Sequence, residues 1–277
     1  MARFLCLAGE PATVPVRVLR GSAARLSRKD PTGIFLQSVL EELGAGEEYV
    51  EAHILQTRAE GRLALMQELG QYPLASGLVV PDFATFHESF AGYPRIWLSE
   101  EDFDIHDPVS RARLEHEAAH AVLHGEISCY IMGTSPALKY LSRQGRMTRD
   151  EADLASYLLL IGIKDYQVSC LLAGTSFEED QVEFYREELS VPTRVGSIWD
   201  ALAELKVLLA ASPFHRNQVV SSLLEGSLRG LGPYRKLAEG IIYDLQEHRG
   251  EELSSILETA SGRLAQRVAG GCLGPEC

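Results

Sequence analysis

RLEHEAAHAVLHG, residues 113–125, contains three of the eight histidines in this chain of 277 residues. They stand four positions apart, as His116, His120 and His124. In an α-helix, residues four apart lie on one face, about one turn from each other. If the segment is helical, two of these imidazoles can reach the same metal ion from one rigid element.

The surrounding residues predict where this helix begins and ends. Asp107 can cap its N-terminus, Pro108 fits its first turn, and Gly125 can end it. We therefore expect one helix over residues 108–124.

Glu117 gives the segment a possible chemistry. The run HEAAH has the H-E-x-x-H pattern, in which two histidines bind zinc and the glutamate serves as general base. Glu117 lies about 100° around the helix from His116, so it can reach a water on the open side of the ion. The metal lowers the pKa of that water, and the glutamate takes its proton. We expect one zinc ion held by His116 and His120, with Glu117 as the catalytic residue.

The longer segment YPRIWLSEEDFDIHDPVSRARLEHEAAHAVLHG, residues 93–125, resembles the edge strand and active-site helix of the zincin metallopeptidases. It is most similar to the small cytoplasmic gluzincin-like enzymes, which often carry HExxHxxLH. The resemblance covers residues 77–175. It implies an α+β core with a mixed sheet, whose edge strand precedes the active-site helix and aligns an extended peptide or protein substrate above the zinc.

The third zinc ligand is open at this point. Gluzincin-like enzymes take a carboxylate from a second helix. Its sequence pattern is a glutamate, three residues and a second carboxylate, and this chain has no good match to that pattern. Asp165 lies among apolar residues, where a charge needs a partner or a metal, so we favour it over Glu151 and Asp153. Glu151 has another role available, as the capping-box partner of Thr148. Asp165 could instead pair with Lys164 or be solvated at a helix junction.

Two further side chains have weaker assignments. His124 lies one more turn along the same straight helix, and one tetrahedral ion cannot easily take ligands from three successive turns. We expect it to support a ligand or to interact with the helix C-terminus. Among the nearby tyrosines that could stabilise a tetrahedral oxyanion, we prefer Tyr166, next to Asp165.

The rest of the chain predicts mixed α and β structure up to residue 190 and helices thereafter. Runs in which apolar and polar residues alternate predict strands, and apolar residues at helical spacing predict helices. Gly162 is a weak point in the helix expected over residues 148–174. The strand ranges are 3–19, 77–90 and 94–99, and the helix ranges are 33–46, 53–72, 148–174 and 178–189. After Pro192 the apolar spacing predicts three to four helices and no strand. We therefore divide the chain into a zincin-like α+β core, residues 1–190, and a helical C-terminal region, residues 191–277.

Composition limits the partners and the compartment. The net charge of -13 argues against nucleic acid and against an anionic membrane surface, since both attract basic patches. The longest apolar run, YLLLIGI at 157–163, is too short to span a bilayer. Five scattered cysteines, an odd number, are typical of free thiols in a reducing cytoplasm. We expect a cytoplasmic protein.

Two functions fit this pattern. The first is a zinc-dependent hydrolase that cleaves peptides. The alternative is a non-catalytic metal-binding or regulatory protein that retains the HExxH helix and docks a partner through its C-terminal helices. An open fourth position at the metal would favour catalysis, and a fourth protein ligand would favour a structural role.

Overall fold

The computed structural model describes residues 16–21, 25–26, 30–45, 49–73, 82–192 and 195–270. Within these residues the chain forms one five-stranded sheet in the order β2-β1-β3-β5-β4. Strands β1, β3 and β5 are parallel, whereas β2 and β4 run antiparallel to their neighbours. The strands are β1 (Val16–Arg20), β2 (Arg25–Leu26), β3 (Val50–Leu55), β4 (Thr85–Glu88) and β5 (Arg95–Ser99).

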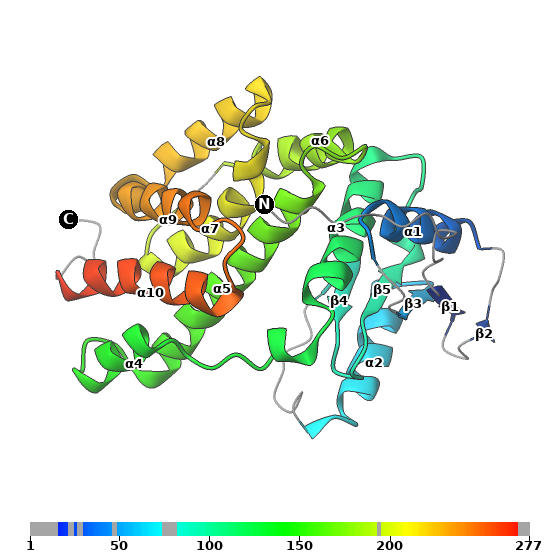
Figure 1. The fold of residues 1–277 in the computed structure, drawn as a ribbon, viewed down its shortest axis with the longest axis horizontal. Helices are drawn as coiled ribbons and strands as arrows, with labels where there is room; N and C mark the ends of the chain where they lie inside the picture. The colour runs from blue at the N-terminus through cyan, green and yellow to red at the C-terminus, as the bar shows by residue number, and fades with distance from the viewer. Residues whose placement is uncertain are drawn as a thin grey trace, which may run out of the picture.

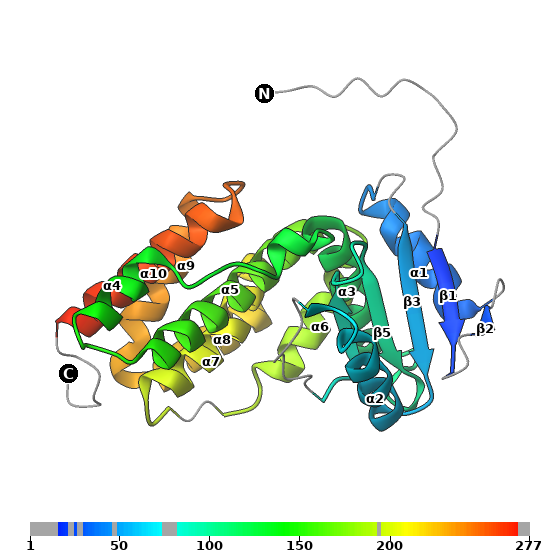
Figure 2. The ribbon, with the colours of Figure 1, turned by 90° about the horizontal axis from the view of Figure 1, so that it is seen from below.

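The helices surround this sheet and extend away from it (Figures 1 and 2). They are α1 (Pro31–Glu42), α2 (Arg58–Leu69), α3 (Pro108–His124), α4 (Pro136–Arg143), α5 (Arg149–Leu172), α6 (Glu178–Glu188), α7 (Ile198–Ala211), α8 (Gln218–Gly230), α9 (Arg235–Glu247) and α10 (Leu253–Ala269). The α+β class expected from the sequence is confirmed. Among the described helices, none combines the length and the hydrophobicity that crossing a bilayer requires.

The two faces of the sheet pack against different helices. Alternate residues of a strand point to opposite faces, so Ile96 and Leu98 of β5 join the core formed with α1 and α3. Trp97, between them, joins a smaller cluster with Leu65 and Leu69 of α2. Ile96 and Leu98 therefore lie on the same face of the sheet, opposite Trp97.

The expected position of β5 in the sheet is wrong. Residues 94–99 were expected to form the edge strand, but β5 lies between β3 and β4, and β4 is at the edge. All five residues of β5 are buried, as suits a strand covered on both faces and paired on both sides. The strand at the edge, β4, still precedes α3 in the chain. Its four residues pair antiparallel to β5.

The helix expected over residues 53–72 is also partly wrong. Its first part belongs to β3, which pairs with β1 and β5 and is buried at five of six positions. A short buried strand of this kind has no alternation of polar and apolar residues to distinguish it from a helix. The helix proper is α2, which begins after Thr57, whose side chain accepts a hydrogen bond from Glu60 N.

Other helix boundaries follow the sequence signals closely. Asp107 caps α3 by accepting from Ser110 N at 2.8 Å, and Gly125 follows its last residue. Thr148 and Glu151 form the expected capping box of α5, which continues without a break through Gly162. Four helices, α7 to α10, occupy the described part of the C-terminal region, as expected. Helix α4 was not predicted.

One hydrophobic cluster connects the sheet with the C-terminal helices. It includes Val18 of β1, Leu114 of α3, Leu209 of α7 and Val268 of α10. Helix α5 lies between α3 and α7 and contacts both. The division at residue 190 stays a prediction, and the expectations for residues 3–15 and for Cys272 and Cys277 lie outside the described residues.

Candidate metal centre

Helices α3 and α5 bring two histidines and an aspartate together. His120 Nε2 lies 3.1 Å from His116 Nε2 and 3.1 Å from Asp165 Oδ1. His116 Nε2 is 3.6 Å from the same carboxylate oxygen. The two histidines are one turn apart on α3, and α5 passes across them with Asp165 facing α3. These residues form a group that could hold one metal ion.

The spacing of these atoms suits zinc. Zinc binds histidine nitrogen and carboxylate oxygen at about 2.1 Å, so two ligands of a tetrahedral ion stand roughly 3.4 Å apart. The three donor pairs here measure 3.1, 3.1 and 3.6 Å. The donor set therefore fits one small tetrahedral cation without movement of the helices.

A chain of hydrogen bonds behind His120 selects its tautomer. Its Nδ1 lies 3.1 Å from His124 Nδ1, and His124 Nε2 lies 3.0 Å from Gln167 Oε1. An amide oxygen only accepts, so His124 donates from Nε2 and accepts at Nδ1. His120 then donates from Nδ1, which leaves its Nε2 lone pair directed at the site. His124 thus hydrogen-bonds the ring of His120 and does not belong to the donor group.

Burial keeps His120 and His124 neutral. It lowers the pKa of His120 well below its ordinary value and that of His124 to about 4, because the charged imidazolium loses its hydration. A metal binds the neutral ring, so His120 is in the required form at pH 7.

Asp165 is held by a lysine from the C-terminal region. Its Oδ2 lies 3.4 Å from Lys206 Nζ on α7. Burial alone would raise the pKa of Asp165, but Lys206 and the two histidines hold it well below its ordinary value. The pairing with Lys164 that the sequence left open is not observed, because Lys164 Nζ lies 3.8 Å from the centre of the Tyr130 ring.

Glu117 faces the edge strand. Its Oε1 accepts a hydrogen bond from Thr85 Oγ1 of β4 at 3.4 Å, and burial raises the pKa of its carboxyl. Also on β4, His87 stacks on His120 with ring centres 5.8 Å apart, and its Nδ1 lies 2.5 Å from the Tyr130 hydroxyl. Strand β4 therefore forms one wall of the candidate site.

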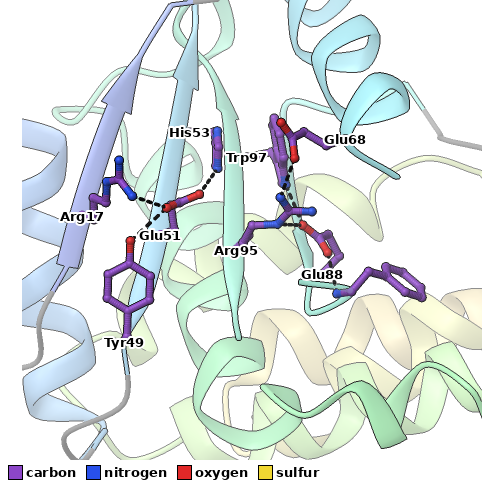
Figure 3. A network of polar contacts seen from close by, with 9 residues as sticks. Arg17, Tyr49, Glu51, His53, Glu68, Glu88, Arg95 and Trp97 are labelled. Carbon is purple, nitrogen blue, oxygen red and sulfur yellow. Dashed lines mark hydrogen bonds and ion pairs between the residues drawn. The ribbon is translucent and has the colours of Figure 1, made fainter. Parts of the chain in front are cut away.

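A buried polar network holds β4 against β5 (Figure 3). Glu88 at the end of β4 accepts hydrogen bonds from Arg95 Nε and, at 3.1 Å, from Trp97 Nε1. Arg95 also pairs with Glu68 of α2 at 3.2 Å. On the same face, Glu51 of β3 pairs with Arg17, Tyr49 and His53. Because Glu88 and Arg95 are both buried, breaking the pair would leave an uncompensated charge, which explains why so short an edge strand is held in place.

The other sequence candidates lie elsewhere. Glu151 accepts from Thr148 N at 2.7 Å in the capping box, and Asp153 bonds to Thr134. Tyr166 packs into the hydrophobic core. None of the three belongs to the group that could hold a metal.

Sequence reasoning did not find three residues around this group: Thr85, His87 and Lys206. None has a recognisable spacing to the HEAAH motif, since they come from a short strand before it and a helix far after it. Only the charge of Lys206 within an otherwise apolar stretch of α7 was available as a signal.

Comparisons of the chain with protein-family models, with curated proteins and with solved structures find no match. The geometry of the site is therefore the basis for any functional conclusion.

Proposed function

We propose that this protein is a zinc-dependent hydrolase of peptides, with zinc held by His116, His120 and Asp165 and with Glu117 as general base. The observation that supports it is the number of donors. Three donor atoms from the described residues converge, which leaves a tetrahedral ion one position for water or substrate. A purely structural site would use four protein ligands, so the alternative of a non-catalytic metal-binding protein is less well supported.

Glu117 performs the proton transfers in this proposal. Zinc, when bound, lowers the pKa of a water molecule and polarises the substrate carbonyl. Glu117 would take a proton from the attacking water and pass it to the leaving amine as the C–N bond breaks. Burial raises the pKa of Glu117, which brings it closer to that of a base working near neutral pH. Thr85 holds one of its carboxylate oxygens in place.

The edge of the sheet supports a peptide as substrate. Strand β4 pairs with β5 on one side only, among the strands that the structure describes. An extended peptide can add to such an edge through main-chain hydrogen bonds. Because Thr85 of β4 contacts Glu117, a peptide on this edge would run beside the general base.

The first test is the metal content of protein purified without added zinc. We expect about one zinc per chain in the wild type, since three donors and a water complete one tetrahedral ion. Asp165→Ala should lose most of it. Glu151→Ala is the matched control: it removes a carboxylate from the same helix but outside the donor group, and should keep the metal. Wild-type protein that takes up no zinc on dialysis would contradict the proposal and favour an interaction protein.

The role of Glu117 is tested separately from metal binding. Glu117→Gln keeps the size of the side chain but cannot accept the proton, so it should retain zinc and lose hydrolysis of a peptide library. A Glu117→Gln protein as active as the wild type would exclude this residue as the base.

A further inference from the structure

The packing of α7 against α5 places a lysine at the candidate metal site. A side-chain carbon at Gly162 of α5 would stand 3.4 Å from the Lys206 Cα and 3.0 Å from Leu209 Cδ1. The two helices can approach this closely only because position 162 has no side chain. The close approach brings the Lys206 ammonium to 3.4 Å from Asp165 Oδ2, on the opposite side of the carboxylate from the histidines.

Lys206 is also the accessible member of the cluster. Its side chain is 49% exposed, compared with 9% for Asp165. The side chains of His116 and His120 are 16% and 10% exposed. A ligand entering the site from solvent can therefore meet the Lys206 side chain more readily than the carboxylate of Asp165.

Binding of a divalent metal would change the charge balance around Lys206. Without metal, two ammonium groups, those of Lys206 and Lys164, interact with two carboxylates, those of Asp165 and Glu117. With a divalent ion held by Asp165, four positive charges stand against two negative ones. The site then carries a net positive charge, and Lys206 is the member of the cluster whose side chain is most exposed, which favours a negatively charged group in the ligand.

From this we infer that Lys206 is a specificity-determining residue that binds a carboxylate of the substrate close to the scissile bond; the inference rests on the proposed hydrolase function. When the scissile bond precedes the last residue of a peptide, the C-terminal carboxylate carbon is three bonds, roughly 3 to 4 Å, from the scissile carbonyl carbon. Such a carboxylate can reach Lys206 while the carbonyl lies at the metal position. The substrates would be peptides, or N-acyl amino acids, that lose their last residue.

The test uses binding to the zinc-loaded full-length protein, so it needs no turnover. The probes are succinic acid monohydroxamate and its neutral carboxamide counterpart, which share the metal-binding hydroxamate and differ in the distal charge. We expect the wild type to bind the carboxylate probe about threefold to tenfold more tightly in calorimetric titration, the range for a half-exposed ion pair. This preference should decrease at high salt.

Variants assign the preference to Lys206. Lys206→Gln can still donate a hydrogen bond to Asp165 but has no charge, so the ratio of its affinities for the two probes should fall to about one. Lys206→Arg should keep the preference. Lys139→Met is the matched control, because it removes an exposed lysine from α4, away from the site, and should behave as the wild type (Figure 1).

Three results would overturn the inference. Equal affinity of the wild type for both probes would show that the site does not select a carboxylate. A preference that persists in Lys206→Gln would assign it to another residue. Zinc-loaded protein that binds neither probe would contradict the open metal position itself, and with it the proposed function.

Discussion

Glu115 lies on α3 beside the candidate ligand His116, but its side chain faces α6 and is 1% exposed. Gln181 Nε2 donates to its Oε2 at 3.0 Å, while Oε1 has no hydrogen-bond partner among the described residues. Burial raises the pKa of this carboxyl to about 8, because the ionised form loses its hydration. At neutral pH the folded protein therefore holds Glu115 as the protonated acid.

This carboxyl predicts a loss of stability with rising pH. Above pH 4.5 the unfolded chain releases the proton, whereas the folded chain keeps it up to about pH 8, so unfolding releases a proton throughout this window. The contribution of Glu115 to the free energy of unfolding should fall as pH rises from 5 to 8. Glu115→Gln cannot ionise, so its stability relative to the wild type should increase by about 3 kcal/mol between pH 5 and pH 8.

Urea unfolding at both pH values measures this difference. Exposed Glu179→Gln on α6 is the control, and should differ from the wild type equally at both pH values. If Glu115→Gln also differs from the wild type equally at both, the buried carboxyl does not ionise in this window.

At the scale of elements, α5 connects the two halves of the candidate site. It is one helix of 24 residues, and it carries Asp165 toward α3 on one side and packs on α7 on the other. Gly162 was expected to weaken the helix. It is instead a position where α7 packs closely against α5. The glycine is used for close packing and not for a break in the helix.

Gly162→Val should destabilise the protein by about 2 to 3 kcal/mol, because the added carbons enter a closely packed contact with Leu209 and with the backbone of α7. The control is Gly226→Ala on α8, where a side-chain carbon meets nothing within 4 Å. That change should stabilise the protein by about 0.5 to 1 kcal/mol through helix propensity. The denaturant midpoint should therefore decrease for Gly162→Val and increase for Gly226→Ala. A Gly162→Val protein with the midpoint of the wild type would contradict the close packing of α5 on α7.

At the scale of the whole molecule, the C-terminal helices share the core of the α/β part. The hydrophobic cluster runs from β1 to α10. Helix α7 packs on α5 and supplies the lysine that pairs with Asp165. From these contacts we expect residues 1–190 and 191–277 to differ in composition but to unfold together as one cooperative unit.

A chain ending at Ser190 should therefore not fold cooperatively. Its α5 would lose the packing of α7, and α5 contributes buried apolar residues such as Leu159 and Ile163 to the shared cluster, so the exposed surface should promote aggregation. Size-exclusion chromatography and thermal unfolding of this fragment provide the measurement, with the full chain as reference. A monomeric fragment with a sharp transition would show that residues 1–190 are an independent domain.

The sequence alone determined the helix that carries the HEAAH motif. Asp107, Pro108 and Gly125 act within a few residues of themselves, so α3 begins and ends where they predict. The same holds for Thr148 and Glu151 at the start of α5. The common direction of His116 and His120 also follows from helix periodicity.

Only the tertiary structure decided what meets this helix. Asp165 could be named as a candidate from its apolar surroundings, but its distance to His120 depends on how α5 crosses α3. The internal place of β5, the strand at residues 50–55 and the approach of Thr85 had no local signal, and the charge of Lys206 did not show where α7 would pack. Caps and periodicity arise from contacts between near neighbours in the chain, whereas pairing between distant elements depends on how their apolar surfaces pack, which no short stretch of sequence encodes.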